Sequence, residues 1–333
     1  MIRKAILILI YIGLPALVGF LVYTTLQDYL TQPADRTRSE LTLIEIPENS
    51  RFKELAQQLE EKGIIKSRWS LLVIAKIQAK DALIKAGEYQ LSPAMTPLQI
   101  LSIITEGKIF LRRFTVKEGM SIKEIGPLIE QVEILSKQEF QAALSDKTLL
   151  QSLGISADSL EGYLFPETYQ FPRGTKPQRI ITAMAEQLNK VWDPAWNQKL
   201  QELQLSKHQL LTLASIIEKE SGKVDEQPLI ASVFYNRLRS GMRLQSDPTV
   251  IYGIPNFNGN ITRADLDTPT PYNTYTIDGL PPGPICNPGL TAIQAALNPA
   301  STNYLYFVGN GQGRHVFSEN LDDHNRAVNE FQR

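Results

Sequence analysis

LLTLASIIEKES, residues 210–221, decides how the C-terminal half of this chain folds. Just upstream, Ser206 and Gln209 stand at the spacing of a capping box, so the first amide groups of a helix find side-chain acceptors there. At about 100° per residue, the apolar side chains gather on one face, and Glu218 falls at its margin. Glu220 points roughly 200° away, and we expect it to contribute little. The stretch therefore predicts an amphipathic helix with one carboxylate at its apolar border.

A carboxyl group that is half-buried against apolar neighbours resists ionisation, so we expect a raised pKa for Glu218. A raised pKa lets a carboxyl group donate a proton at neutral pH, as a general acid must. The alternative is an ordinary solvated glutamate at a helix border, and this helix alone leaves it open. His208, His315 and His324 lack the spacings of zinc ligands, and the sequence has no phosphate-binding glycine loop or serine nucleophile elbow. We expect no metal and no cofactor.

The composition and the N-terminus suggest a membrane-anchored protein. With 333 residues, 43% hydrophobic content and a formal charge of −1, the chain can bury about two or three cores and has no excess basic charge for nucleic acid. Arg3 and Lys4 precede an uncharged run over residues 5–26, which is long enough to span a bilayer as a helix. The basic pair places residues 1–4 in the cytoplasm and the rest in the periplasmic or extracytoplasmic space. We therefore predict a single-pass anchor in the inner (plasma) membrane.

Between the anchor and the Leu210 helix, the sequence predicts small strand–helix modules. Residues 27–40 are polar and read as a linker. A strand–turn–helix pattern then occurs twice, about seventy residues apart, with a further strand and helix between the copies. The expected strands are 41–46, 87–91 and 114–116, and the expected helices run through 52–59, 96–106 and 122–129. We assign residues 41–158 to this region, which either binds glycan or serves only as a spacer.

From about residue 159 the composition shifts toward aromatic residues, Pro, Gly and Asn, which marks a second domain at 159–333. We expect helices at 177–192 and 229–238, a long loop at 272–289, a helix started by Asn287-Pro288, a hairpin within 304–318 and a last helix capped by Asn320. Cys286 is the only cysteine, which excludes an intrachain disulfide and suggests a buried thiol. The expected fold class is α+β.

Several stretches in fixed order carry a family resemblance. They are LEGYLFPETY (160–169), ASIIEKE (214–220), QSDPTV (245–250), YNTY (272–275), GLPPGPI (279–285) and NPG (287–289). In this order they resemble the endolytic murein transglycosylase family, over roughly residue 41 to the C-terminus. The resemblance implies a LysM-like module, a catalytic domain and a catalytic glutamate at Glu218. It also implies peptidoglycan glycan strands as substrate, a role in limiting nascent strand length, and peptidoglycan synthases (penicillin-binding proteins) as possible partners.

For such an enzyme, one carboxyl group can carry the whole reaction. Glu218 would protonate the oxygen between N-acetylmuramic acid and N-acetylglucosamine, and then take the proton of the muramic 6-hydroxyl as it attacks the anomeric carbon. The product is a 1,6-anhydromuramoyl end, formed without water. Our candidates for the substrate pocket are Glu161, Gln245, Asp247, Asn273 and Tyr275.

Two other classes of function stay open at this point. A murein hydrolase would need a second carboxylate in the same cleft, and Glu161 and Asp247 could supply it. A non-catalytic wall-binding scaffold would need no carboxylate chemistry. Product analysis separates the three, because anhydro ends, reducing ends and intact strands are different outcomes.

Overall fold

The computed structural model describes residues 13–332, and the chain divides into two compact units with the boundary between Arg112 and Arg113. Each unit has its own buried apolar cluster. Among the described residues, helices dominate and the strands pair into three two-stranded sheets. The predicted α+β class is confirmed.

The first unit is built on strands β1 (Thr42–Ile46) and β2 (Gly87–Leu91), which pair antiparallel with Thr42 opposite Leu91. The helices α3 (Phe52–Glu61), α4 (Arg68–Ile77) and α5 (Pro97–Glu106) pack with these strands. A capping box starts α5 at Thr96, and Gly107 ends it in the left-handed conformation. The predicted strands at 41–46 and 87–91 and the helix at 96–106 are therefore confirmed.

The helix α2 (Leu14–Thr31) is the first described element of this unit, and it contacts α4 and α5. The predicted anchor at 5–26 lies partly outside the described residues, as do Arg3 and Lys4. Large apolar side chains along the described part of the run are exposed, among them Leu14, Phe20 and Val22. Within residues 13–332, no helix combines the length and the apolar character that crossing a membrane requires.

The strand β3 (Arg112–Thr115) starts at the boundary and lies in the second unit from Arg113 on; it pairs with β4 (Thr168–Phe171). The helices α6 (Ile122–Gln131), α7 (Lys137–Leu144) and α8 (Lys147–Ser152) lie between these strands in the sequence, and α9 (Pro177–Val191) follows β4. Capping boxes at Ser121 and Ser136 start α6 and α7, so these helix starts are encoded locally.

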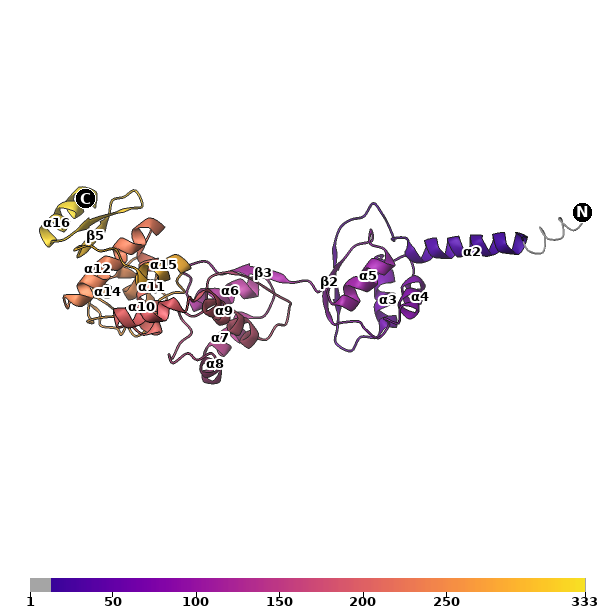
Figure 1. Ribbon diagram of the computed structural model, residues 1–333, viewed down its shortest axis with the longest axis horizontal. Coiled ribbons are helices and arrows are strands. Elements are labelled where there is room, and N and C mark those ends of the chain that lie inside the picture. The colour runs from indigo at the N-terminus through magenta and orange to yellow at the C-terminus, as the bar shows by residue number, and fades with distance from the viewer. Residues whose placement is uncertain (1–12, 333) are drawn as a thin grey trace, which may run out of the picture. The chain divides into compact units, whose positions relative to one another are not determined.

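The rest of the second unit is helical, with one small hairpin (Figure 1). In order, it contains α10 (Ala195–Leu203), α11 (Lys207–Glu220), the short 3₁₀ helix η2 (Val224–Glu226), α12 (Gln227–Arg239), α13 (Asp247–Gly253), α14 (Arg263–Asp267), α15 (Leu290–Leu297), β5 (Tyr306–Gly309), β6 (His315–Ser318) and α16 (Leu321–Phe331). The predicted hairpin is β5–β6, and Asn320 caps α16 through its side chain as expected.

Two predictions about organisation differ from the structure. The two strand–helix copies exist, but the second copy, β3 and α6, belongs to the second unit, so the predicted region at 41–158 is divided at Arg112. The helix that we expected to start at Asn287-Pro288 starts instead at Leu290, with Gly289 as its N-cap. The reason lies in Asn287, whose backbone and side chain bond to other segments and hold it out of the helix.

Candidate active site

The helix α11 is the centre of the candidate site. The expected capping box is present: Ser206 Oγ accepts from the Gln209 amide at 3.1 Å, and Gln209 Oε1 accepts from the Ser206 amide at 2.9 Å. Residues 210–217 are buried all around rather than on one face, because α12, α13 and α15 pack against α11. Burial ends at the last turn of α11. The carboxylates on this turn therefore lie at the edge of the core.

Glu218 is partly buried, and its Oε2 accepts a hydrogen bond from the backbone amide of Gly289 at 3.0 Å. Burial raises the pKa of Glu218, and the negative charge of Glu118 raises it further. The Gly289 amide and the positive charge of Lys219 act in the opposite direction and lower this pKa. The net result is a carboxyl group that stays protonated to higher pH than an exposed glutamate does. After proton transfer, the Gly289 amide can stabilise the carboxylate that remains.

The Gly289 amide is held in place by Asn287, which is fully buried. Its Oδ1 accepts hydrogen bonds from the amides of Gly162 at 3.1 Å and Leu164 at 3.0 Å, and its Nδ2 donates to the carbonyl of Met120 at 2.9 Å. One side chain thus joins three segments that are distant in the sequence. Sequence reasoning missed this role of Asn287, although the NPG triplet at 287–289 was among the motifs.

Glu161 is almost completely buried, at 1% exposure, and both of its carboxylate oxygens are occupied by the protein. The Ile122 amide donates to Oε1 at 3.0 Å, and the Tyr252 hydroxyl donates to Oε2 at 3.1 Å. Burial raises the pKa of Glu161 to about 7, although both hydrogen bonds act to lower it. Glu161 is therefore buried between α6 and α13, and its hydrogen bonds join these two helices.

A second group of polar side chains surrounds Glu220. Ser246 Oγ donates to Glu220 Oε1 at 2.5 Å, and burial, followed by the charge of Asp247, raises the pKa of Glu220 to about 7. The Tyr275 hydroxyl donates to Asp247 Oδ1 at 2.7 Å, and exposed Gln245 is the residue before Ser246. Three of the predicted pocket residues therefore gather here. Glu220 does not face solvent, because this side of α11 packs against α13. That Glu220 contributes little to the activity stays a prediction.

Asn273 has no exposed surface and organises the loop around it. Its Nδ2 lies within hydrogen-bonding distance of the carbonyls of Asp265, Leu266 and Thr268, at 3.3, 2.9 and 2.7 Å. Its Oδ1 accepts from the Tyr275 amide at 2.9 Å. The predicted long loop is thus ordered by hydrogen bonds to the Asn273 side chain, and the polar atoms of this side chain are all bonded to protein groups.

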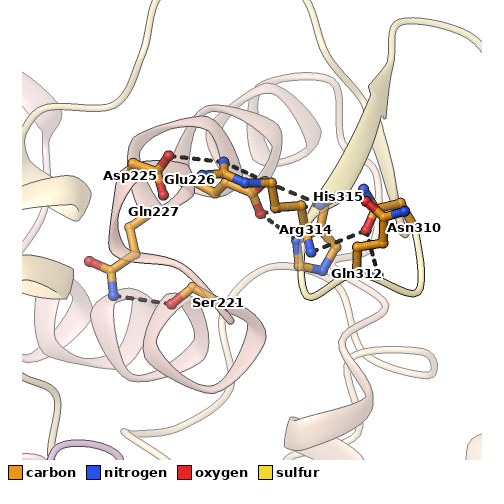
Figure 2. A network of polar contacts seen from close by, with 8 residues as sticks. All are labelled: Ser221, Asp225, Glu226, Gln227, Asn310, Gln312, Arg314 and His315. Carbon is orange, nitrogen blue, oxygen red and sulfur yellow. Dashed lines mark hydrogen bonds and ion pairs between the residues drawn. The ribbon is translucent and has the colours of Figure 1, made fainter.

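A further polar network fixes the segment that leaves α11. Figure 2 shows the carboxylate of Glu226, which is 4% exposed, facing His315, whose Nδ1 lies 2.9 Å from Oε2. Arg314 pairs with Asp225 at 2.9 Å. Gln227 Nε2 donates to Ser221 Oγ, the C-cap of α11, at 3.1 Å. These contacts hold the β5–β6 hairpin against the end of the helix that carries Glu218.

Metal-binding clusters of three or more His, Cys, Asp or Glu side chains do not occur within residues 13–332. Cys286 is fully buried, as predicted, and burial raises the pKa of its thiol well above the usual range. The chemical groups gathered at the site are carboxylates, amides and hydroxyls. This arrangement is suited to acid–base chemistry on a neutral, hydroxyl-rich substrate.

Sequence and structure comparisons identify the family. The model of the YceG-like family matches residues 44–330, which is most of the chain, so the protein belongs to this family. The resemblance to endolytic murein transglycosylases that the motifs indicated is thereby confirmed.

Three relatives show how far the similarity extends. The chain is 34% identical over 318 residues to the endolytic murein transglycosylase of Bacillus subtilis (strain 168), covering 91% of this chain and 88% of that protein. It is 31% identical to the endolytic murein transglycosylase of Streptococcus pneumoniae (serotype 2, strain D39), covering 97% of this chain but only 64% of that protein. A crystal structure of a YceG-like protein from Listeria monocytogenes aligns with a TM-score of 0.60 at 35% identity, covering 86% of this chain and 98% of that one.

Proposed function

We propose that this protein is an endolytic murein transglycosylase that cleaves glycan strands of peptidoglycan with Glu218 as its proton carrier. The observation that carries the proposal is the placement of Glu218, a partly buried carboxyl group with a raised pKa at the end of the buried helix α11. The names of the relatives from Bacillus subtilis and Streptococcus pneumoniae support the same activity.

The reaction needs one group that first gives and then takes a proton. Protonated Glu218 donates to the oxygen between N-acetylmuramic acid and N-acetylglucosamine, and the bond from that oxygen to the anomeric carbon breaks. The muramic 6-hydroxyl oxygen then bonds to the anomeric carbon, and its proton returns to Glu218. Glu218 is restored, water is not consumed, and the strand ends in a 1,6-anhydromuramoyl residue. The Gly289 amide stabilises Glu218 in the interval when it is a carboxylate.

For the substrate pocket, we propose two kinds of role. Gln245 and Asp247 are exposed, and Tyr275 is partly exposed beside Asp247, so they can contact sugar hydroxyls directly. Glu161 and Asn273 have their polar atoms occupied by protein groups, and we propose that they shape the pocket rather than touch the sugar.

Product analysis of the purified protein acting on sacculi tests the function. Mass spectrometry should find 1,6-anhydromuramoyl ends. The rate of the Glu218→Gln variant should fall by a factor on the order of 10² to 10⁴. We expect the upper end of this range because one residue serves both steps. Glu186→Gln on α9 removes an exposed carboxylate elsewhere in the same unit and should keep full activity. Reducing ends as the main product, or an active and folded Glu218→Gln variant, would overturn the proposal.

For the N-terminus, we propose a single-pass anchor at residues 5–26, with residues 1–4 in the cytoplasm. The uncharged run and the exposed apolar side chains of the described part of α2 support it. The proposal also makes the inner membrane and its peptidoglycan synthases neighbours of the enzyme. A reporter fused after Arg333 should be active only outside the cytoplasm, and cytoplasmic activity would refute the orientation.

For the first unit, we propose a LysM-like module that orients glycan. The order β1, α3, α4, β2, with the two strands antiparallel, supports this assignment. A separate buried core, made by residues such as Ile44, Leu59 and Tyr89, also supports a module that folds around its own centre.

A further inference from the structure

The loop after β3, residues 117–121, is attached to the candidate site by its backbone. The Gly119 amide donates to the Asn287 carbonyl at 3.0 Å, and the Asn287 amide donates to the Met120 carbonyl at 2.9 Å. Lys219, the neighbour of Glu218 on α11, reaches the Gly119 carbonyl with Nζ at 3.4 Å. A segment about one hundred residues before the catalytic helix is therefore fixed against both that helix and the 285–289 loop.

This attachment brings a second carboxylate, Glu118, to Gly289. A methyl group added to Gly289 would overlap the Glu118 carboxylate, whereas the amide of the same glycine lies 3.0 Å from Glu218 Oε2. These contacts, with standard covalent lengths, put the two carboxylates within about 8 Å of each other. Glycosidases with two catalytic carboxyl groups separate them by about 5 to 9.5 Å. Gly289 is therefore the common contact of both carboxylates, and its missing side chain makes room for the second.

The environments of the two carboxylates differ. Glu118 is exposed to solvent, and its negative charge acts on Glu218. It also lies at the N-terminus of α15, where the helix dipole favours negative charge. Glu218 is partly buried. The groups that interact with it are Glu118 on the 117–121 loop, Lys219 on the same helix and the Cys286 thiol on the 285–289 loop. Two neighbouring carboxyl groups in different environments can divide the work of a reaction between them.

We propose, on the basis of the proposed transglycosylase function, that Glu118 is a second catalytic residue, a carboxylate facing the anomeric carbon of the muramic residue. When the bond to the leaving oxygen breaks, positive charge develops on the anomeric carbon and the ring oxygen. Glu118 stabilises this charge electrostatically and forms no bond. The proton travels only between Glu218, the leaving oxygen and the 6-hydroxyl, and the 6-hydroxyl oxygen supplies the electron pair for the new bond.

Glu118→Gln keeps the size of the side chain and removes its charge. The rate of anhydromuropeptide release should fall on the order of 10²-fold, as when one preorganised electrostatic group is removed from an active site. The alkaline limb of the pH profile should also move to lower pH, because Glu118 no longer raises the pKa of Glu218. A purely structural role would change the melting temperature rather than this limb. Glu186→Gln is the charge-matched control and should change neither.

Gly289→Ala provides an independent variant. Gly289 has φ of −74°, which alanine adopts without strain, and the amide that contacts Glu218 is kept. The new methyl group displaces the flexible end of Glu118, so this variant should reproduce the loss of rate. In the Glu118→Gln, Gly289→Ala double variant the two losses should not multiply, because both remove the same interaction.

The outcomes separate this inference from the proposed function. If Glu218→Gln is inactive while Glu118→Gln is folded and keeps the wild-type rate and pH profile, the role of Glu118 is refuted and the function stands. Losses that multiply in the double variant would likewise refute it. If wild type releases reducing ends, the second carboxylate activates water, and both the function and the role given to Glu118 fail.

Discussion

Asn287→Ala tests whether one buried amide side chain holds the candidate site together. The substitution leaves the amides of Gly162 and Leu164 buried without their acceptor, and the Met120 carbonyl loses one of two donors. An unsatisfied buried donor costs about 1–3 kcal/mol, so the two amides together cost about 2–6 kcal/mol of the free energy of unfolding. The total free energy of unfolding of a typical domain is about 5–15 kcal/mol. The variant should therefore be strongly destabilised.

Urea unfolding followed by circular dichroism measures this loss as a shift of the transition midpoint. Asn298→Ala is the matched control, because Asn298 is exposed and its Nδ2 makes one bond, to the Gln294 carbonyl at 3.2 Å. It should cost less than about 0.5 kcal/mol. Activity of folded Asn287→Ala should also fall, since Gly289 is no longer held for Glu218. The reasoning is refuted if both variants unfold at the same urea concentration.

Three further predictions concern pH and the two units. Activity should decline as pH rises through the raised pKa of Glu218, because the protonated form starts the reaction, and anhydromuropeptide release across pH measures this. The pKa of Glu220 is about 7 in the folded protein and about 4.5 when unfolded, so its burial lowers stability as pH rises from about 4.5 to 7, by at most about 3 kcal/mol. Urea unfolding of Glu220→Gln at pH 5 and pH 8 should show a smaller fall than wild type, and an equal fall would contradict the burial argument. Deletion of residues 41–111 should weaken cleavage of sacculi. Soluble glycan strands should still be cut, because the second unit has its own core. If the deletion does not weaken cleavage of sacculi, the first unit is only a spacer.

The sequence by itself determined the local elements and the family. Capping boxes at Thr96, Ser121 and Ser206 set helix starts because both partners lie within four residues of each other. Apolar periodicity likewise predicted β1, β2 and α11, because this signal lies entirely within one short segment of the sequence. The ordered motifs were sufficient to indicate the family, whereas the proton-carrying role of Glu218 stays a prediction.

Only the tertiary structure decided the domain boundary and whether each carboxylate is buried, exposed or in contact with another segment. The two strand–helix copies look alike in sequence, yet β3 pairs with β4 rather than with β1 or β2, which assigns the second copy to the other unit. Glu161 and Glu220 are turned inward by Tyr252 and Ser246, residues from distant parts of the chain. Glu118 reaches Gly289 across about 170 positions. Hydrogen bonds and burial between remote segments leave no periodic signal in either segment alone, and for this reason only the folded chain reveals them.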